Sequence, residues 1–290
     1  MDILFITHTR IGDAVLSSGV LRHLVDKHPE ARITIVCGPL AASLFAAVPR
    51  SRVVVMTKEP FDGHWLKLWK TVRATRWDLV VDLRRSLVSY FLSARERRVL
   101  GPADDSIHRV RYLSSVLGLA EPAAPFLYTT PAHHAAARAL VPDGAPVLAV
   151  SPVAATAAKT WPAECFASVI TTATAPGGVR AGWRVALFGS PADREQVAPL
   201  VEGLSQTPLL IFNEPDLLVV HAALARCGRF IGNDSGLAHL AAAAGIPVLS
   251  LFGPTDPVRY APWGPAARTL RAPDGVIAHM EASAVLAALA

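Results

Sequence analysis

The fold is decided by DILFITHTRIGDAVLSSGVLRHLVDKHPEARITIVCG, residues 2–38. The stretch opens and closes with short apolar runs, DILFITH at 2–8 and RITIVCG at 32–38. Residues 12–28, between them, have the length and the spacing of apolar side chains that are typical of an amphipathic helix. Continuous apolar strands joined by a helix are typical of a parallel sheet that is covered on both faces. The stretch therefore predicts a strand–helix–strand unit.

The same alternation continues along the chain. RVVVM at 52–56 and DLVVDLR at 78–84 predict further strands, with helices expected at 40–48 and 64–76. Pro, Ala and Gly then accumulate between residues 122 and 146, as is typical of an inter-domain connection. A second series of strands follows, at 147–153, 183–190, 209–213, 229–234 and 247–253, with helices starting at Pro162, Asp193, Asp216 and Ser235.

Two alternating series predict an α/β protein of two Rossmann-like, doubly wound parallel-sheet domains. We place these domains at residues 1–140 and 141–290 and expect them to face each other across a central cleft. Ligands of open parallel sheets bind at the carboxyl ends of the strands. The loops that follow the strands are therefore the places to search for chemistry.

Composition narrows the class of protein. With 52% hydrophobic and 18% charged residues, the chain has enough apolar material to exclude a disordered protein. The net charge of +5 is too small to indicate nucleic-acid binding, so no nucleic-acid partner is expected. Residues 1–145 hold 19 basic and 13 acidic side chains, whereas residues 146–290 hold 9 and 10. A polyanionic partner should therefore approach the first half.

Three well-separated cysteines, Cys37, Cys165 and Cys227, form neither a disulfide pattern nor a metal-ligand spacing, so we predict no metal site. The first residues do not resemble a signal peptide, and no apolar run is long enough to cross a membrane. We therefore expect a cytoplasmic protein. Peripheral contact with the cytoplasmic face of the inner membrane stays open as a second expectation.

The loop after the first strand, THTRIGDAVLSSGVL, places Gly12 and Asp13 at the start of a helix. Glycine permits a tight turn or a close backbone approach at this point. A carboxylate at this position has two interpretations, a helix cap or a general base facing the ligand. No GxGxxG motif is present, which argues against a nicotinamide or flavin dinucleotide site.

The loop SPVAATAAKTWPAECF contains Lys159 among small residues, before a helix opened by Pro162. Lys159 is either a solvated surface cation or a cation that reaches a phosphate at the end of the strand.

The most informative loop is RFIGNDSGLAHLAAAAGIPVLSLFGPTDP, near the end of the chain. Asp234 and Ser235 are typical capping residues, and free backbone N–H groups at Ser235, Gly236 and Leu237 would form an anion site. His239, one turn further, either packs in the core or faces the same ligand. The loop has no Walker motif and no carboxylate pair, so a phosphate held here would not need a metal ion.

At these three loops the sequence resembles glycosyltransferase family 9, the ADP-heptose:lipopolysaccharide heptosyltransferases. The matching pieces are RIGDAVLSSGVLRHL, the run from Lys159 to Phe166, and NDSGLAHLAAAAGIPVLSLFGPTDP. The resemblance implies a GT-B fold with an N-terminal acceptor domain and a C-terminal sugar-nucleotide domain. It also implies inverting, metal-independent transfer of heptose from ADP-heptose to the anionic inner core of lipopolysaccharide, without a cofactor.

The resemblance also implies residue roles. Asp13 corresponds to the catalytic base and Lys159 to the lysine on the donor phosphates, while Asp193 falls where an acidic residue lies near the ribose. The helix start that binds the diphosphate corresponds to Asp234, Ser235, Gly236, Leu237 and His239. Ala154 and Ala155 replace hydroxyl side chains that are frequent in the family and leave Thr156 as the nearby hydroxyl. Arg10 stands where small hydroxyl residues are frequent.

For the acceptor we select Arg10, Gly12, Arg97 and Arg98. The wider set of candidate arginines also includes Arg84, Arg85, Arg95, Arg109 and Arg111. Three alternatives remain: a GT-B transferase that uses another nucleotide sugar, a sugar-nucleotide epimerase, and a catalytically silent nucleotide-sugar-binding protein of envelope assembly.

Overall fold

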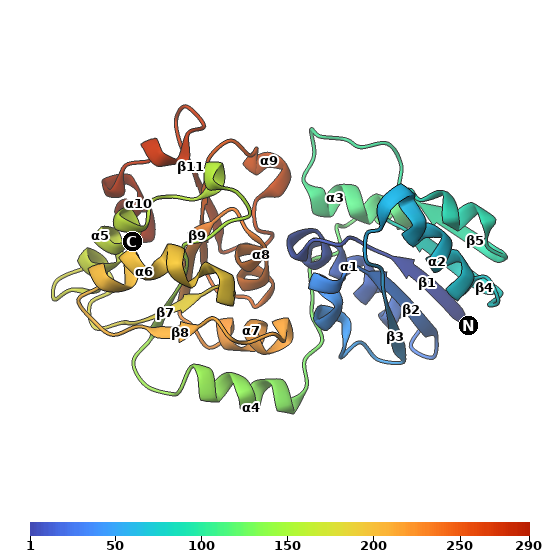
Figure 1. The fold of residues 1–290 in the computed structure, drawn as a ribbon, viewed down its shortest axis with the longest axis horizontal. Helices are drawn as coiled ribbons and strands as arrows, with labels where there is room; N and C mark the ends of the chain where they lie inside the picture. Colours follow the sequence, from blue (N-terminus) through green and yellow to red (C-terminus); the bar gives the residue numbers. More distant parts are fainter. The chain divides into compact units, whose positions relative to one another are not determined.

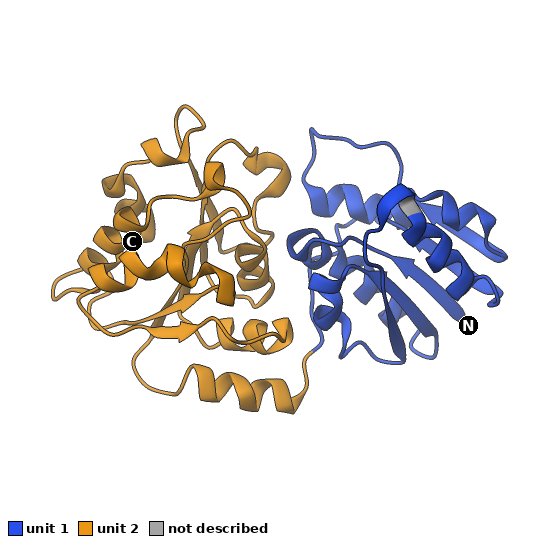
Figure 2. Ribbon diagram, viewed as in Figure 1, with its two compact units in different colours: residues 1–128 blue, residues 129–290 orange. Residues whose placement is uncertain are grey.

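The protein is described by a computed structural model that covers residues 1–61 and 63–290. The chain divides into two compact units, Met1–Tyr128 and Thr129–Ala290 (Figure 2). Each unit is built on its own parallel sheet, as the alternation of apolar runs predicts. None of the helices in the described part of the chain combines the length and hydrophobicity needed to span a lipid bilayer.

Unit 1 contains a five-stranded parallel sheet in the order β3-β2-β1-β4-β5 (Figure 1). Its strands are β1 (Asp2–Ile6), β2 (Arg32–Cys37), β3 (Ser51–Val55), β4 (Trp77–Asp82) and β5 (Ala94–Val99). The connections and the segment after β5 contain α1 (Ile11–Lys27), η1 (Pro39–Phe45), η2 (Pro60–Asp62), α2 (Gly63–Val72), η3 (Leu87–Phe91), α3 (Arg109–Ser114) and η4 (Ser115–Leu117).

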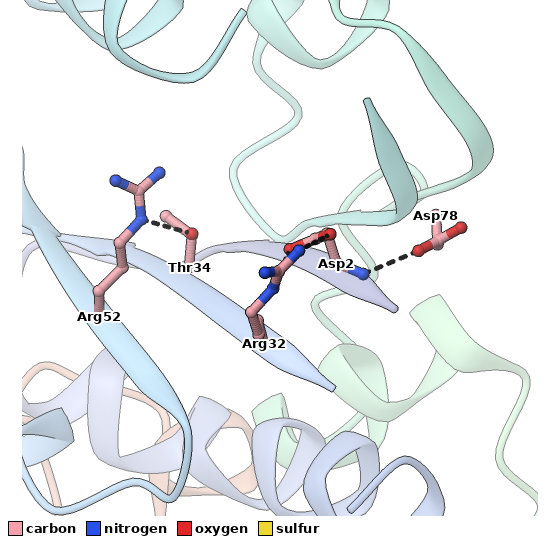
Figure 3. A network of polar contacts seen from close by, with 5 residues as sticks. All are labelled: Asp2, Arg32, Thr34, Arg52 and Asp78. Carbon is pink, nitrogen blue, oxygen red and sulfur yellow. Dashed lines mark hydrogen bonds and ion pairs between the residues drawn. The ribbon is translucent and has the colours of Figure 1, made fainter. Parts of the chain in front are cut away.

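A polar network fastens the amino-terminal edge of this sheet (Figure 3). Arg32 on β2 donates from Nε and Nη2 to the two carboxylate oxygens of Asp2 on β1, at 2.9 and 2.7 Å. The backbone N–H of Asp2 donates to Asp78 on β4 at 2.8 Å, and Arg52 Nε on β3 donates to Thr34 Oγ1 at 2.9 Å. The bond from Arg32 lowers the pKa of the Asp2 carboxyl below its ordinary value. These bonds hold four strands in register at the edge opposite to the strand-end loops.

Helix α1 is clamped by the last segment of unit 1. A Cβ at Gly19 would lie 2.1 Å from the carbonyl oxygen of Ala123, so only glycine fits there. Ser18 Oγ donates to Val15 O at 2.7 Å and accepts from the backbone N–H of Phe126 at 2.9 Å. Residues 123–126 therefore lie directly against α1.

Unit 2 contains a six-stranded parallel sheet in the order β11-β10-β9-β6-β7-β8 (Figure 1). Its strands are β6 (Val147–Ser151), β7 (Arg184–Phe188), β8 (Leu209–Ile211), β9 (Arg229–Asn233), β10 (Val248–Phe252) and β11 (Ala267–Arg271). Its helices are α4 (Pro131–Leu140), η5 (Ala157–Lys159), α5 (Ala163–Thr174), η6 (Pro191–Asp193), α6 (Arg194–Gly203), α7 (Leu217–Leu224), α8 (Gly236–Ala243), α9 (Pro257–Tyr260), η7 (Ile277–His279) and α10 (Ala282–Leu289).

The core of unit 2 centres on Trp161, which is fully buried and packs edge-on against Phe166 with ring centroids 5.0 Å apart. Trp161 Nε1 donates to the carbonyl of Met280 at 3.0 Å, which ties the loop after β6 to the segment before α10. Buried Trp N–H groups need such a partner. The loop that carries Lys159 is therefore anchored by its neighbour Trp161.

The structure differs from the sequence expectations in three places. Residues 122–146, expected to be a connection only, contain α4, which packs against α7 of unit 2. For this reason the compact units divide between Tyr128 and Thr129 instead of at 140/141. The segment expected to form a helix at 40–48 is the 3-10 helix η1. Strands β5 and β11 were not expected.

Candidate functional site

Asn233 joins two strand-end loops of unit 2. It is the last residue of β9 and is fully buried. Its Oδ1 accepts from the backbone N–H of Trp161 at 3.1 Å, and its Nδ2 donates to the carbonyl of Pro152 at 2.8 Å. Because both bonds reach the segment after β6, Asn233 fixes the loop that contains Lys159 against the end of β9.

The two charged residues of these loops form an ion pair. Lys159 Nζ lies 2.7 Å from Asp234 Oδ2, and Asp234 is only 8% exposed. Lys159 ends η5 and keeps part of its side chain accessible. The solvated-lysine interpretation is thus not what the structure shows. Thr156, the N-cap residue of η5, is exposed at the same loop.

Helix α8 begins beside this pair. Ser235 is its N-cap residue, and the helix starts at Gly236. The serine side chain makes no capping bond, and its buried Oγ has no hydrogen-bond partner among the residues that the structure describes. The first N–H groups of a helix lack intrahelical acceptors and attract anions. The residues predicted to bind an anion, Lys159, Ser235 and the amides from Gly236 to Leu237, thus lie at one place, at the start of α8.

His239 is buried one turn into α8, at 6% exposure. This burial agrees with the interpretation of His239 as a packed residue of α8, and its contact with a ligand stays a prediction. Gly253, after β10, borders the same region, because a Cβ there would lie 3.0 Å from the carbonyl oxygen of Ala158. Only glycine lets the loop after β10 approach the loop that carries Lys159 this closely.

Asp193 has a local structural role. Its Oδ2 accepts from the backbone N–H and from the Oγ of Ser190, both at 2.7 Å, in a capping box at the end of β7. Asp193 therefore lies in the loop after β7, and its carboxylate caps the start of η6.

In unit 1, Arg10 is the N-cap residue of α1, and Asp13 lies in the first helical turn. Asp13 makes no capping hydrogen bond, but as the acidic residue of the first turn it lies where a carboxylate interacts favourably with the helix dipole. Asp13 Oδ1 instead faces Arg109 Nε at 3.5 Å, with 24% of the Asp13 side chain exposed. Gly12 lies in the same turn. The carboxylate is thus accessible at the carboxyl edge of the sheet and held by one arginine.

Arg109 also fixes the protonation of His8. Arg109 Nη2 lies 2.8 Å from His8 Nε2, and since arginine can only donate, Nε2 must accept. A neutral His8 then carries its proton on Nδ1, which has no hydrogen-bond partner among the described residues. Burial, with further help from Arg109 and Arg84 and against the opposing effect of Asp13, lowers the pKa of His8 from 6.5 to about 4. His8 is therefore neutral at pH 7.

Two cavities open at the same edge of unit 1. The larger, of about 630 Å³, is lined by residues that include Thr9, Arg10, Leu40, Lys58, Trp65 and Arg84. The smaller, of about 250 Å³, is lined by residues that include His8, Arg84, Arg85, Arg109 and Tyr112. Arg84 borders both, and its side chain lies over the ring of Trp65 at 4.7 Å. Both cavities are basic, which suits an anionic ligand.

The selected pair Arg97 and Arg98 does not join this group. Arg97 donates from Nε to Ser89 O at 2.9 Å and from Nη2 to Leu92 O, so it fastens η3 to β5. Arg98 pairs with Glu96 on the same edge strand. Neither lines the two cavities described above. The sequence missed His8 and Lys58, because neither residue belongs to a recognisable local motif.

Across residues 1–61 and 63–290, no three His, Cys, Asp or Glu side chains are grouped as a metal site would require. The three cysteines are free thiols. Burial raises the pKa of Cys37 and of Cys227 to about 12, so both are inert at neutral pH.

The family model described as glycosyltransferase family 9 (heptosyltransferase) matches residues 104–286. The chain belongs to glycosyltransferase family 9. The resemblance inferred from the three motifs is thereby confirmed, and this family 9 chain is a glycosyltransferase.

Individual relatives agree with the family. The chain is 26% identical to lipooligosaccharide heptosyltransferase 2 of Haemophilus influenzae, over 95% of this chain and 90% of that one. It resembles the structure of Escherichia coli ADP-heptose lps heptosyltransferase II with a TM-score of 0.79 and 23% identity, covering 100% and 97% of the two chains. Likeness to E. coli heptosyltransferase WaaC with ADP gives a TM-score of 0.76 and 20% identity, covering 100% and 99%. The fold of this family 9 chain is GT-B.

Proposed function

We propose that the chain transfers heptose from ADP-heptose to the anionic inner core of lipopolysaccharide, with inversion at the anomeric carbon and without a metal ion. The observation that carries this proposal is the ion pair of Lys159 and Asp234 beside the open N-terminus of α8. The names of the relatives support the choice of donor and acceptor, since one is an ADP-heptose lps heptosyltransferase and another was solved with ADP.

In this proposal the donor diphosphate binds to unit 2. Lys159 supplies a charge-assisted hydrogen bond, and the amides of α8 supply the positive end of the helix dipole. Ser235 Oγ, which is buried and has no hydrogen-bond partner within the described part of the chain, would donate to a phosphate oxygen. These groups stabilise the negative charge that develops on the leaving ADP, a contribution that is often the largest in catalysis. Asp234 holds the Lys159 side chain in place.

The acceptor binds to unit 1, where Asp13 would take the proton of the attacking hydroxyl. General-base assistance of this kind is worth about 10²–10⁴-fold in rate. Arg109 Nε pairs with the Asp13 carboxylate, and Nη2 of the same guanidinium donates a hydrogen bond to Nε2 of neutral His8. Arg10, Lys58 and Arg84 line the larger cavity and would face the carboxylates or phosphates of the core. One displacement step with a base and a stabilised leaving group inverts the anomeric carbon.

The test is to mix the protein with ADP-heptose and a truncated lipopolysaccharide core, and to measure release of ADP and the mass of the product. Parallel reactions contain UDP- or GDP-sugars, or EDTA, and NMR of the product reads the anomeric configuration. Turnover with ADP-heptose that survives EDTA is the expected result. Turnover only with another nucleotide sugar would replace the donor, and ADP binding without any turnover would indicate a silent binding protein.

A further inference from the structure

Helix α2 and the 3-10 helix η3 cover part of one face of the sheet in unit 1. Helix α2 connects β3 to β4, and η3 connects β4 to β5, so both run back from the carboxyl edge of the sheet. The two elements contact each other, and Trp69 Nε1 of α2 donates to the carbonyl of Phe91 in η3 at 3.2 Å. Leu68 and Val72 of α2 and Val88 of η3 fill the core beneath them.

Four large apolar side chains are exposed on these two elements. Leu66 of α2 is 56% exposed, and in η3 the exposed fractions are 74% for Leu87, 61% for Tyr90 and 72% for Phe91. Trp69, between the two elements, is partly buried. We call this group, Leu66, Trp69, Leu87, Tyr90 and Phe91, the α2–η3 surface. Clustered exposed apolar residues of this kind mark interaction sites.

The charge around the α2–η3 surface is positive. Residues 63–95 contain seven Lys and Arg side chains and only two acidic residues, Asp78 and Asp82. Asp82 is fully buried and accepts hydrogen bonds from Ser86, and Asp78 is engaged at the amino-terminal edge of the sheet. The exposed cations of the same stretch are Lys70, Arg73, Arg76, Arg85 and Arg95, whereas Lys67 is paired with Glu59.

We propose that the α2–η3 surface binds the interface of a bilayer that contains anionic phospholipids. Trp and Tyr favour the headgroup level, Leu and Phe side chains insert below it, and Lys and Arg are attracted to anionic headgroups. Arg73 already lies over the Trp69 ring at 4.6 Å, an arrangement that keeps a cation next to an interfacial aromatic. A second copy of the chain would present the same positive surface, so charge complementarity selects the membrane.

The α2–η3 surface is continuous with the larger cavity of unit 1. Trp65, on α2, lines that cavity together with Arg84, and Leu40, which is 66% exposed, lies at its border. A membrane-anchored acceptor could therefore enter the cavity while its lipid stays in the bilayer. This last point rests on the proposed function, whereas binding to the bilayer does not.

The experiment is sedimentation of the protein with vesicles of phosphatidylcholine alone or with about one third phosphatidylglycerol, in the absence of any substrate. We expect binding to the mixed vesicles, and weaker binding at high salt. Lys70→Gln with Arg73→Gln should lower the partition constant by about 25-fold, at about fivefold for each cation near the surface. Tyr90→Ser with Phe91→Ser should lower it by about tenfold or more.

The matched controls are Val258→Ser and Arg138→Gln, an exposed apolar and an exposed basic residue of unit 2, which should bind like the unchanged chain. Circular dichroism verifies that every variant is folded. Equal binding of the surface variants and the controls would overturn the proposal. It would also be overturned if, without lipid, the chain sediments as a dimer that only Tyr90→Ser with Phe91→Ser dissociates, since the occupant would then be a second copy.

Turnover separates this proposal from the proposed function. A water-soluble, delipidated core should be used equally well by the unchanged chain and by Tyr90→Ser with Phe91→Ser. Vesicle binding without turnover would refute the transferase proposal alone, and turnover without vesicle binding would refute the membrane proposal alone.

Discussion

Acidification from pH 7 to pH 5 should destabilise unit 2 through His221. This residue lies on α7, is 8% exposed, and donates from Nδ1 to the carbonyl of Leu240 in α8 at 3.4 Å. Burial is the main cause that lowers its pKa from 6.5 to about 4, and nearby His134 acts in the same direction, while the bond to Leu240 opposes both. The folded protein therefore keeps a neutral imidazole against α8, the helix at whose N-terminus we propose the phosphate site.

The sign and size of the effect follow from proton linkage. Between pH 6.5 and pH 4 the unfolded chain protonates this histidine and the folded chain does not, so the free energy of unfolding falls as the pH falls. With a folded pKa of about 4 and an unfolded value of 6.5, the loss between pH 7 and pH 5 is about 2 kcal/mol. The stabilisation that comes from keeping His221 neutral is fully present only when the pH is above the unfolded pKa of 6.5.

The assay is urea unfolding at pH 7 and pH 5 for the unchanged chain and for His221→Leu. Leucine leaves no orphaned acceptor, because Leu240 O also accepts from the backbone N–H of Ala244 at 3.0 Å. His221→Leu should reduce the loss of stability on acidification by about 2 kcal/mol, whereas His279→Gln, at an exposed histidine, should not. His8 contributes equally to all three proteins. The same pH dependence in His221→Leu and in the unchanged chain would refute the reasoning.

Four further outcomes are expected. Asp13→Asn should abolish transfer and leave ADP affinity unchanged by calorimetry, because the residue lies in unit 1; near-normal turnover would leave it as a structural carboxylate only. Lys159→Ala should weaken ADP binding by about tenfold or more, since a charge-assisted bond is worth about 1.5–3 kcal/mol; unchanged affinity would contradict this. Gly38→Val should lower thermal stability by about 1–3 kcal/mol, because a Cβ there would lie 2.6 Å from Thr9 Cβ; an unchanged melting temperature would refute the close approach. Salt should raise the KM for the acceptor more than the KM for the donor, because surface charges are screened over about 8–10 Å; equal slopes in parallel salt titrations would remove the basic cavities as the acceptor site.

The buried strands could be predicted because each is an uninterrupted apolar run flanked by turn residues. Strand β5 could not, since its sequence ARERRV has four exposed charged residues and it pairs only with β4 at the edge of the sheet. Helix α4 was not predicted, because five of its ten residues are alanines, which indicate a buried face only weakly. Its start was nevertheless visible, as Thr130 forms a capping box with His133 and Pro131 occupies the first helical position.

The candidate site also contains residues that the sequence could predict and residues that it could not. The residues around Asp234 were found because a strand, a capping pair and a small-residue helix follow each other within one local stretch. The contact of His8 with Arg109 joins residues 101 positions apart, and no local pattern signals it. The choice of Arg97 and Arg98 relied on charge alone, and charge does not reveal that Arg97 donates hydrogen bonds to the carbonyls of Ser89 in η3 and of Leu92 just after it.

The clamp on α1 has a mechanical consequence. The backbone N–H of Phe126 is hydrogen-bonded to Ser18, and the Phe126 ring lies 3.9 Å from the Arg22 guanidinium. The backbone of Ala123 lies directly against Gly19, with no space for a side chain between them. Only Leu127 and Tyr128 then separate this anchor from the start of unit 2, a tether that spans at most about 10 Å when fully extended. A force transmitted through this short link would therefore act on α1, the helix that carries Asp13 in its first turn.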